Sequence, residues 1–299
     1  MTMAVFDRNL LRRRRDRAAV LARDYDFLLQ ETAERLTERL DAVRRALPVM
    51  LDLGSAHGVM SEKLMRREGT SHVISADLSY AMAQASCGLS VVADEEFFPF
   101  APESLDAVVS NLSLHWVNDL PGALLQIRRA LKPDGLFLAA FLGGESLREL
   151  RACLMEAEMA VTGGASPRVS PFASLQDAAV LMQRAGFALP VVDSDIITVR
   201  YKDAFRLMRD LRGMGAADVA HGRSRRFVSR RVMVEAARIY AERHQDAQGL
   251  ITASFEVIFA IGWAPHESQQ QPLTPGSAKA KLADALQAIE MPAGEKVPR

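Results

Sequence analysis

The chain has 299 residues, a formal net charge of zero from 37 basic and 37 acidic side chains, and a hydrophobic content of 49%. This balance excludes a general nucleic-acid binder, because such proteins neutralise phosphates with an excess of Lys and Arg. The sequence has no apolar run of about 18 residues, so we expect no transmembrane helix. It is longer than one cofactor domain of roughly 200 residues, so insertions must account for the surplus.

The N-terminal segment is rich in arginine. Arg12 to Arg15 form an unbroken basic run, and two more arginines follow by residue 23. We interpret this run as a solvated helix face, with an acidic partner or an anionic membrane surface as the alternative. Apolar residues from Leu21 to Leu40 recur at a spacing that predicts one buried face of a helical arm over residues 16–46.

A glycine-bearing turn follows the first apolar strand. Residues 49–53 predict a buried strand that opens directly into Gly54-Ser55-Ala56-His57-Gly58. Glycine lets the backbone turn sharply at the strand end and pack closely where the next helix begins, which is typical of nucleotide sites. A second apolar run, residues 72–77, ends in Asp77, which is placed to accept hydrogen bonds from ribose hydroxyls.

Three further apolar runs continue the pattern. Residues 89–93 precede Asp94, a third acid at a strand end, where an adenine amino group could donate to it. Runs at 105–110 and 135–142 are separated by a helical segment at 120–131 and a turn at 132–135. Strands that alternate with amphipathic segments predict a parallel sheet covered by helices on both faces, with the ligand at the carboxyl ends of the strands. The acids at those ends indicate an adenosine-containing ligand.

These motifs resemble the class I S-adenosylmethionine-dependent methyltransferases, whose first motif is an acid, a small apolar residue and a Gly-x-Gly-x-Gly turn. The resemblance implies an α/β fold with a seven-stranded, mostly parallel, Rossmann-like sheet and bound S-adenosylmethionine. Ala56 replaces the middle glycine and adds a methyl group near the methionine part of the cofactor. The alternative is a dinucleotide-binding dehydrogenase, whose glycine pattern has an extra residue and leaves Asp94 without a use. The cofactor-binding residues that the resemblance implies are Asp52, Gly54, Ala56, Gly58, Asp77, Leu78, Asp94, Glu95, Asn111 and Leu112.

Longer strings carry a closer resemblance and lie far apart in the chain. They include ADEEFFPF at 93–100, NLSLHWVNDLP at 111–121 and IGWAPHESQ at 261–269, with shorter ones at 5–8 and 211–215. These strings resemble the bacterial and mitochondrial family of complex I assembly factor 5. The resemblance implies a role in maturing respiratory NADH dehydrogenase, and the mitochondrial member is described as hydroxylating an arginine of a complex I subunit. A sister family methylates malonyl groups on acyl carrier protein.

The second half of the chain reads as helices and strands around a helical insertion. We expect helices at 145–160 and 174–185, a loop at 162–167, and strands at 188–192 and 196–201. A strand at 252–263 should return antiparallel to its neighbour and close the sheet. In the tail from residue 265 we expect one short amphipathic helix, around Lys279 to Ile289. The insertion at 203–248 carries side chains suited to docking a protein client: Met208, Met214, Arg223, Arg225 and Arg226.

We therefore predict three parts: a helical arm at 1–48, the cofactor domain at 49–263 and a loosely ordered tail at 264–299. The segment from Ser110 to Asp119 is the expected substrate side of the site. Within it, His115 is a candidate base or a hydrogen-bonding residue of the loop, and Trp116 is a candidate cation–π partner for an arginine substrate or a packed aromatic. Nearby acids, Glu95, Glu96 and Asp119, favour a cationic side chain over a malonyl carboxylate, although Glu96 and Asp119 are equally credible as solvated surface acids.

A metal site is not expected. His244, Asp246 and His266 have the composition of a non-haem iron triad, but they lie far in sequence from the cofactor strands and on a predicted helix end. Cys87 and Cys153 have no metal-like spacing and are expected to be reduced thiols.

The sequence thus predicts an S-adenosylmethionine-dependent enzyme that modifies, by hydroxylation, an arginine of a complex I subunit. The alternatives are a methyltransferase acting on a malonyl-acyl-carrier-protein ester or a small acid, and a non-catalytic assembly chaperone. The family-like sequence begins at Val5, so we expect no signal or transit peptide. We expect a bacterial cytoplasmic protein that reaches the inner membrane through its client.

Overall fold

A computed structural model of the chain describes residues 4–224, 227–270, 277 and 283–284. The chain divides into two compact units, Met1–Pro265 and His266–Arg299. In the second unit, residues 266–270 form a turn in which the Ser268 hydroxyl lies 2.7 Å from Nδ1 of His266. The helix expected from Lys279 to Ile289 lies outside the described residues but for Ala283 and Asp284.

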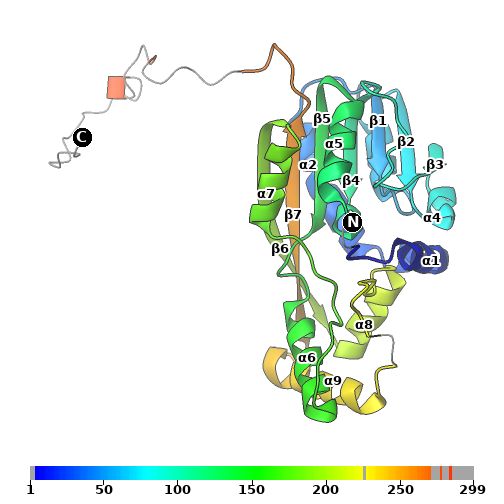
Figure 1. Cartoon of the computed structure of the whole chain (residues 1–299), viewed down its shortest axis with the longest axis vertical. Coiled ribbons are helices and arrows are strands. Elements are labelled where there is room, and N and C mark those ends of the chain that lie inside the picture. The colour runs from blue at the N-terminus through cyan, green and yellow to red at the C-terminus, as the bar shows by residue number, and fades with distance from the viewer. Residues whose placement is uncertain (1–3, 225–226, 271–276, 278–282, 285–299) are drawn as a thin grey trace. The chain divides into compact units, whose positions relative to one another are not determined.

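The first unit contains a seven-stranded sheet with the order β3-β2-β1-β4-β5-β7-β6 (Figure 1). The first five strands pair in parallel, and β7 is antiparallel to both β5 and β6. The predicted fold class and the antiparallel return of the last strand are therefore confirmed. The strands are β1 (Val49–Leu53), β2 (His72–Asp77), β3 (Leu89–Val92), β4 (Leu105–Asn111), β5 (Leu131–Leu142), β6 (Ala188–Tyr201) and β7 (Ile251–Trp263).

Helices cover both faces of this sheet, because the central strands are apolar on both sides. Along β5, Leu136 and Leu138 belong to one buried cluster, whereas Phe137 and Ala139 belong to the other. This alternation is the period of two that a buried parallel strand imposes. The helices are α1 (Arg8–Ala18), η1 (Ala19–Asp24), α2 (Phe27–Asp41), α3 (Val59–Arg66), α4 (Tyr80–Ala85), η2 (Leu114–Trp116), α5 (Leu120–Ala130), α6 (Arg148–Thr162), α7 (Leu175–Arg184), α8 (Ala204–Gly213) and α9 (Arg230–His244).

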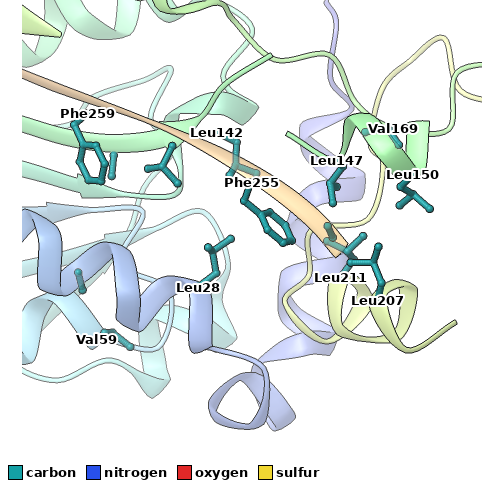
Figure 2. Packing of buried hydrophobic residues seen from close by; sticks show 14 of the residues in the cluster. Leu28, Val59, Leu142, Leu147, Leu150, Val169, Leu207, Leu211, Phe255 and Phe259 are labelled. Atoms are coloured by element: carbon teal, nitrogen blue, oxygen red, sulfur yellow. The ribbon is translucent and has the colours of Figure 1, made fainter. Parts of the chain in front are cut away.

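The helices α6, α8 and α9 lie together at one end of the long strands β6 and β7 (Figure 1). One apolar cluster joins them to the sheet. Phe255 of β7 lies in this cluster with Leu142 of β5 and with Leu211 of α8 (Figure 2). The helical insertion therefore packs on the same core as the cofactor strands.

The helical arm differs from the single helix that the periodicity predicts. It begins earlier, at Arg8, and consists of α1, the 3-10 turn η1 and α2. Leu21, expected on the buried face, is exposed, whereas Leu36 and Leu40 of α2 are buried. Tertiary contacts account for the break: α2 packs on the sheet, while the start of α1 is tied elsewhere by a bridge between Phe6 and Ala220.

Two strand predictions also change. β6 runs unbroken where two strands were expected, because its residues 191–201 pair continuously with β7. As an edge strand it carries exposed polar residues, and Asp193 pairs with Arg39 of α2 at 2.8 Å. The turn expected at 132–135 is an irregularity inside β5, with Asp134 in the left-handed region at φ 60°. Within the described part of the chain, no helix is both long and apolar enough to span a membrane.

Candidate functional site

The turn after β1 forms the floor of the candidate site. Gly54 has φ 74°, and a Cβ at that position would collide with the side chain of Ser113, which packs directly on it. Ala56 also lies in the left-handed region, at φ 48°, a conformation that favours glycine. Its methyl group packs against a small cluster that contains Ala18, Ala22 and Met82. Gly58 begins α3 at φ 94°.

Asp77, at the carboxyl end of β2, is completely buried. Its carboxylate accepts hydrogen bonds from the backbone N–H of Ser79 at 2.7 Å and of Ala56 at 3.0 Å. Its one ion pair among the described residues is with Arg15 of α1, whose Nη1 lies 3.3 Å from Oδ2. Burial raises the pKa of Asp77, and Arg15 opposes that shift. The 3.3 Å separation is longer than the 2.7–2.9 Å typical of charge-assisted bonds, so this pair is loose.

Asp94 and Glu95 contact Arg8, at the N-terminal end of α1. Arg8 Nη2 donates to Asp94 Oδ1 at 2.6 Å and also to Glu95 Oε2. Glu95 is completely buried and accepts a hydrogen bond from the hydroxyl of Ser113. Burial acts to raise the pKa of Glu95, but Arg8 and Arg15 lower it on balance. Helix α1 therefore pairs Arg15 with the acid at the end of β2 and Arg8 with the two acids that follow β3.

Asp52 lies beneath the glycine turn. Its Oδ2 accepts a hydrogen bond from the Ser61 hydroxyl at 2.6 Å, and its Oδ1 is buried without a hydrogen-bond partner among the described residues. Burial raises the pKa of Asp52 to about 7. The hydroxyl of Ser55, in the turn itself, is also buried and unpartnered.

A central cavity of about 90 Å³ opens beside the turn. Its lining includes six of the predicted site residues: Gly54, Ala56, Asn111, Leu112, His115 and Trp116. The other predicted residues do not line it: Asp52, Gly58, Asp77, Leu78, Asp94 and Glu95. Arg15 lines the cavity and contacts Asp77 behind it, so α1 separates the cavity from the acid of β2. Leu78 packs under α1 with Leu11 and Phe6.

His115 and Trp116 form one wall of the central cavity, on the 3-10 turn that follows β4. His115 is buried, and its Nδ1 accepts a hydrogen bond from the backbone N–H of Leu142 at 3.4 Å. Burial, and secondarily Arg15, lowers the pKa of His115 to about 3. Trp116 is also buried, with Phe6 at 5.7 Å and Phe172 at 6.0 Å between ring centroids, both edge-on.

Several residues in the site were missed by the sequence analysis. Asp26 and His57 both line the central cavity, with Asp26 Oδ2 3.0 Å from His57 Nε2. The position of His57 inside the glycine turn was a usable signal, whereas Asp26 lies in the arm and gave none. Arg15 was assigned with the basic run to a solvated face, which is wrong, and Arg8 was given no role in the site. Both side chains are largely buried against acids.

The other candidates lie outside the site. Glu96 Oε1 accepts a hydrogen bond from the backbone N–H of Asn118 at 2.6 Å, and Asp119 caps the start of α5. Among the described residues, no group of three or more His, Cys, Asp or Glu side chains could hold a metal ion. Cys87 and Cys153 are free thiols. Arg223 contacts the Ala220 carbonyl oxygen at 2.9 Å, whereas Arg225 and Arg226 lie outside the described residues.

Comparison with known proteins agrees with this arrangement. A methyltransferase domain family (Methyltransf_11) matches residues 51–139. The mitochondrial arginine-hydroxylase NDUFAF5 of Danio rerio is 40% identical over 292 residues, which cover 94% of this chain and 89% of the relative. The chain belongs to the NDUFAF5 family. This result confirms the resemblance to the complex I assembly factor 5 family and places the chain in the methyltransferase superfamily.

Members of a second family are somewhat less similar. The malonyl-[acyl-carrier protein] O-methyltransferase of Methylovorus sp. (strain MP688) is 34% identical over 275 residues, covering 87% of this chain and 90% of the relative. The crystal structure of the YcgJ protein from Bacillus subtilis has a TM-score of 0.55 at 14% identity, covering 77% of this chain and 98% of that one. At that identity it supports the fold and not the function. The NDUFAF5 family thus remains the family to which this chain belongs.

Proposed function

We propose that this protein binds S-adenosylmethionine and hydroxylates an arginine of a respiratory complex I subunit during assembly of the complex. The observation that carries the proposal is the 40% identity to an arginine-hydroxylase over 94% of the chain. The protein would act in the bacterial cytoplasm and would reach the inner face of the membrane through its client. The client-binding side would be formed by the arm and by the insertion at 203–248.

The site's polar groups fit the cofactor. We assign buried Asp77 as the acceptor for the ribose hydroxyls, and its loose contact with Arg15 at 3.3 Å would be exchanged for those donors. Asp94 would accept from the adenine amino group after release of Arg8. Beside the methionine end, the Ser55 hydroxyl and Asp52 Oδ1 are buried polar atoms without partners, which a ligand or water would satisfy.

The central cavity would hold the target side chain. When it is bound, the cofactor supplies a positively charged sulfonium with a transferable methyl group. The hydroxyl oxygen and the two-electron oxidation of the arginine would come from a separate oxidant, dioxygen, whose second oxygen atom leaves as water with two electrons from a reductant. Asp26 offers a carboxylate in the cavity wall for a guanidinium, and Trp116 offers an aromatic surface. His115 accepts from Leu142 through Nδ1, so its neutral ring carries a proton on Nε2. Its pKa of about 3 keeps it neutral, and we assign it as a hydrogen-bond donor that orients the substrate.

Intact-mass and peptide mass spectrometry of complex I subunits, from cells with and without this gene, tests the proposal. A gene-dependent mass increase of one oxygen atom on an arginine peptide is the expected result. An increase of one CH₂ unit would instead identify a methyltransferase. No gene-dependent change in any subunit, together with impaired assembly, would identify a non-catalytic chaperone.

The second candidate is methylation of a malonyl-acyl-carrier-protein ester, favoured by the 34% identity to an enzyme of that name. Its substrate carries a carboxylate, whereas the central cavity contains the carboxylate of Asp26 and a neutral His115. Because Arg15 also lines this cavity, charge alone does not exclude a carboxylate, and the higher identity to the arginine-hydroxylases ranks this candidate second. Purified protein that methylates a malonyl thioester with S-adenosylmethionine would reverse the ranking.

A further inference from the structure

A second pocket lies beside the central cavity, and no part of the proposed chemistry uses it. We name it the apolar pocket. Its volume is about 380 Å³, within the range of roughly 300–1,000 Å³ typical of ligand sites. The pocket is lined mainly by apolar side chains from α6, α8, α9 and the loops beside them: Leu147, Leu150, Leu154, Val169, Phe172, Met208, Leu211, Val228 and Met233.

The apolar pocket and the central cavity share a wall. Trp116 and Ala216 line both of them. Leu147, Leu150 and Leu211 line the apolar pocket and belong to the cluster shown in Figure 2. The two cavities therefore adjoin one another.

Three polar side chains in the walls of the apolar pocket, Arg168, Ser170 and Asp218, already have partners, and Arg212 in the same lining is exposed to solvent. Arg168 pairs with Glu158, and the Ser170 hydroxyl donates to Asp218 Oδ1 at 2.6 Å. Asp218 also accepts from the backbone N–H of Ala220 at 2.9 Å. A polar ligand group placed among these three side chains would lose water without gaining a free partner, which costs free energy. The pocket therefore selects an apolar group.

The residues around the apolar pocket favour a polypeptide as the source of that group. Phe227 is fully exposed, at 103% of its reference area, and Arg212 is exposed as well. Aromatic residues, methionine and arginine are enriched at protein interfaces. Two residues of extended chain span about 6.6 Å and place their side chains on the same face. An extended client can thus place one side chain in each of two adjoining cavities.

We propose that the apolar pocket binds a large apolar side chain of the client, two residues away from the arginine that enters the central cavity. This inference rests on the proposed function, because it takes the target to be an arginine in a protein. It gives the protein a preference for a particular client sequence, which the names of its relatives do not specify. The client segment binds in an extended conformation, with Trp116 between the two side chains.

Fluorescence anisotropy tests the proposal with the full chain, S-adenosylmethionine and labelled peptides of Gly and Ser that contain one arginine. One test peptide has leucine two residues before the arginine, and the other has leucine two residues after it. Each test peptide has two controls: in the first, serine replaces the leucine, and in the second, the leucine stands directly next to the arginine. The better-binding test peptide should bind roughly tenfold more tightly than its controls. Equal affinities for all peptides would overturn the proposal.

Two variants locate the effect in the pocket. Met233→Glu places a charge in the lining at a half-buried position, and Val234→Glu makes the same change at the exposed neighbouring position on α9, outside the lining. The leucine preference should disappear in Met233→Glu and persist in Val234→Glu. A preference that survives in Met233→Glu would place the leucine elsewhere and would contradict the proposal.

Ala217→Trp fills the apolar pocket without adding charge, from a half-buried loop position. It should abolish the leucine preference and leave affinity for S-adenosylmethionine unchanged. Competition by a free fatty acid, with no effect of the peptide sequence, would assign the pocket to an acyl chain and overturn the inference. Because binding is measured without turnover, this failure is distinct from failure of the proposed hydroxylation, which mass spectrometry of the subunits detects.

Discussion

Arg15 of α1 contacts Asp77 at the end of β2, with 3.3 Å between Nη1 and Oδ2, in a position where both side chains are almost completely removed from solvent. The same helix carries Arg8, which contacts Asp94 and Glu95 at the end of β3. Helix α1 thus neutralises the acids that we propose hold adenosine. We infer that ribose and adenine donors compete with these arginines for the carboxylates.

Arg15→Ala should therefore tighten the binding of S-adenosylmethionine while it destabilises the cofactor-free protein. Loss of the arginine leaves Asp77 buried and unpaired, which we expect to lower the free energy of unfolding by about 3 kcal/mol. The cofactor no longer has to displace a partner, so its affinity should rise roughly tenfold. Calorimetric titration and urea unfolding measure the two effects, and exposed Arg12→Ala is the control. Weaker cofactor binding by Arg15→Ala would show that Arg15 belongs to the bound site.

Asp77→Asn should weaken S-adenosylmethionine binding by about 1.5–3 kcal/mol, because a charge-assisted hydrogen bond to the ribose is lost. Asp94→Asn should have a smaller effect, since Asp94 is partly exposed. Asp193→Asn on the edge strand β6 serves as the control. The assignment of both acids fails if titration gives unchanged affinity for Asp77→Asn and for Asp94→Asn alike.

The sequence predicted the sheet well because strand identity depends on local patterns. Residues 72–77 and 105–110 alternate or run apolar between turn signals, and both form strands within one residue of the expected bounds. The acids at strand ends were also readable, since Asp77 and Asp94 directly follow apolar runs. In these strands the local pattern of apolar residues matches the burial that the folded sheet gives them.

The rest of the site depends on contacts between segments that are distant in the sequence. The spacing of apolar residues does not indicate which distant segments touch. Arg8 and Glu95 are 87 positions apart, and Asp26 and His57 are 31 apart. The arginine run looked like a solvated face, yet Arg15 points inward because α1 crosses the ends of β2 and β3. The break between α1 and α2 has the same origin, since the two helices pack against different parts of the fold.

Ala56 permits a test of the departure from the glycine pattern. At φ 48° alanine is strained by roughly 1–2 kcal/mol, but its methyl group packs on Ala18 and Ala22, and glycine would add unfolded-state entropy. These effects oppose one another, so Ala56→Gly should change the free energy of unfolding by less than about 1 kcal/mol. Ala56→Val should cost more than about 2 kcal/mol, because a β-branched residue is poorly accommodated at positive φ. Equal stability of the valine and glycine variants in urea unfolding would contradict the strained backbone.

Asp52 should make the stability of the protein depend on pH in a direction opposite to that of most carboxylates. Burial raises its pKa in the folded chain to about 7 from an ordinary 3.8. The folded state therefore binds this proton more tightly than the unfolded state does. The resulting stabilisation is complete below the ordinary pKa and is lost as the pH rises through about 7.

Asp52→Asn removes this ionisation and keeps an oxygen that can accept from Ser61. Relative to the variant, the wild-type free energy of unfolding should fall by up to roughly 4 kcal/mol between about pH 4 and pH 8, at 1.36 kcal/mol for each of about three pKa units. The comparison cancels any constant difference in packing between the two side chains. Urea unfolding of both cofactor-free proteins across that range measures it, with Asp193→Asn as the exposed control. Parallel pH profiles for wild type and Asp52→Asn would mean that Asp52 remains ionised in the folded chain, and its buried Oδ1 would then require a donor.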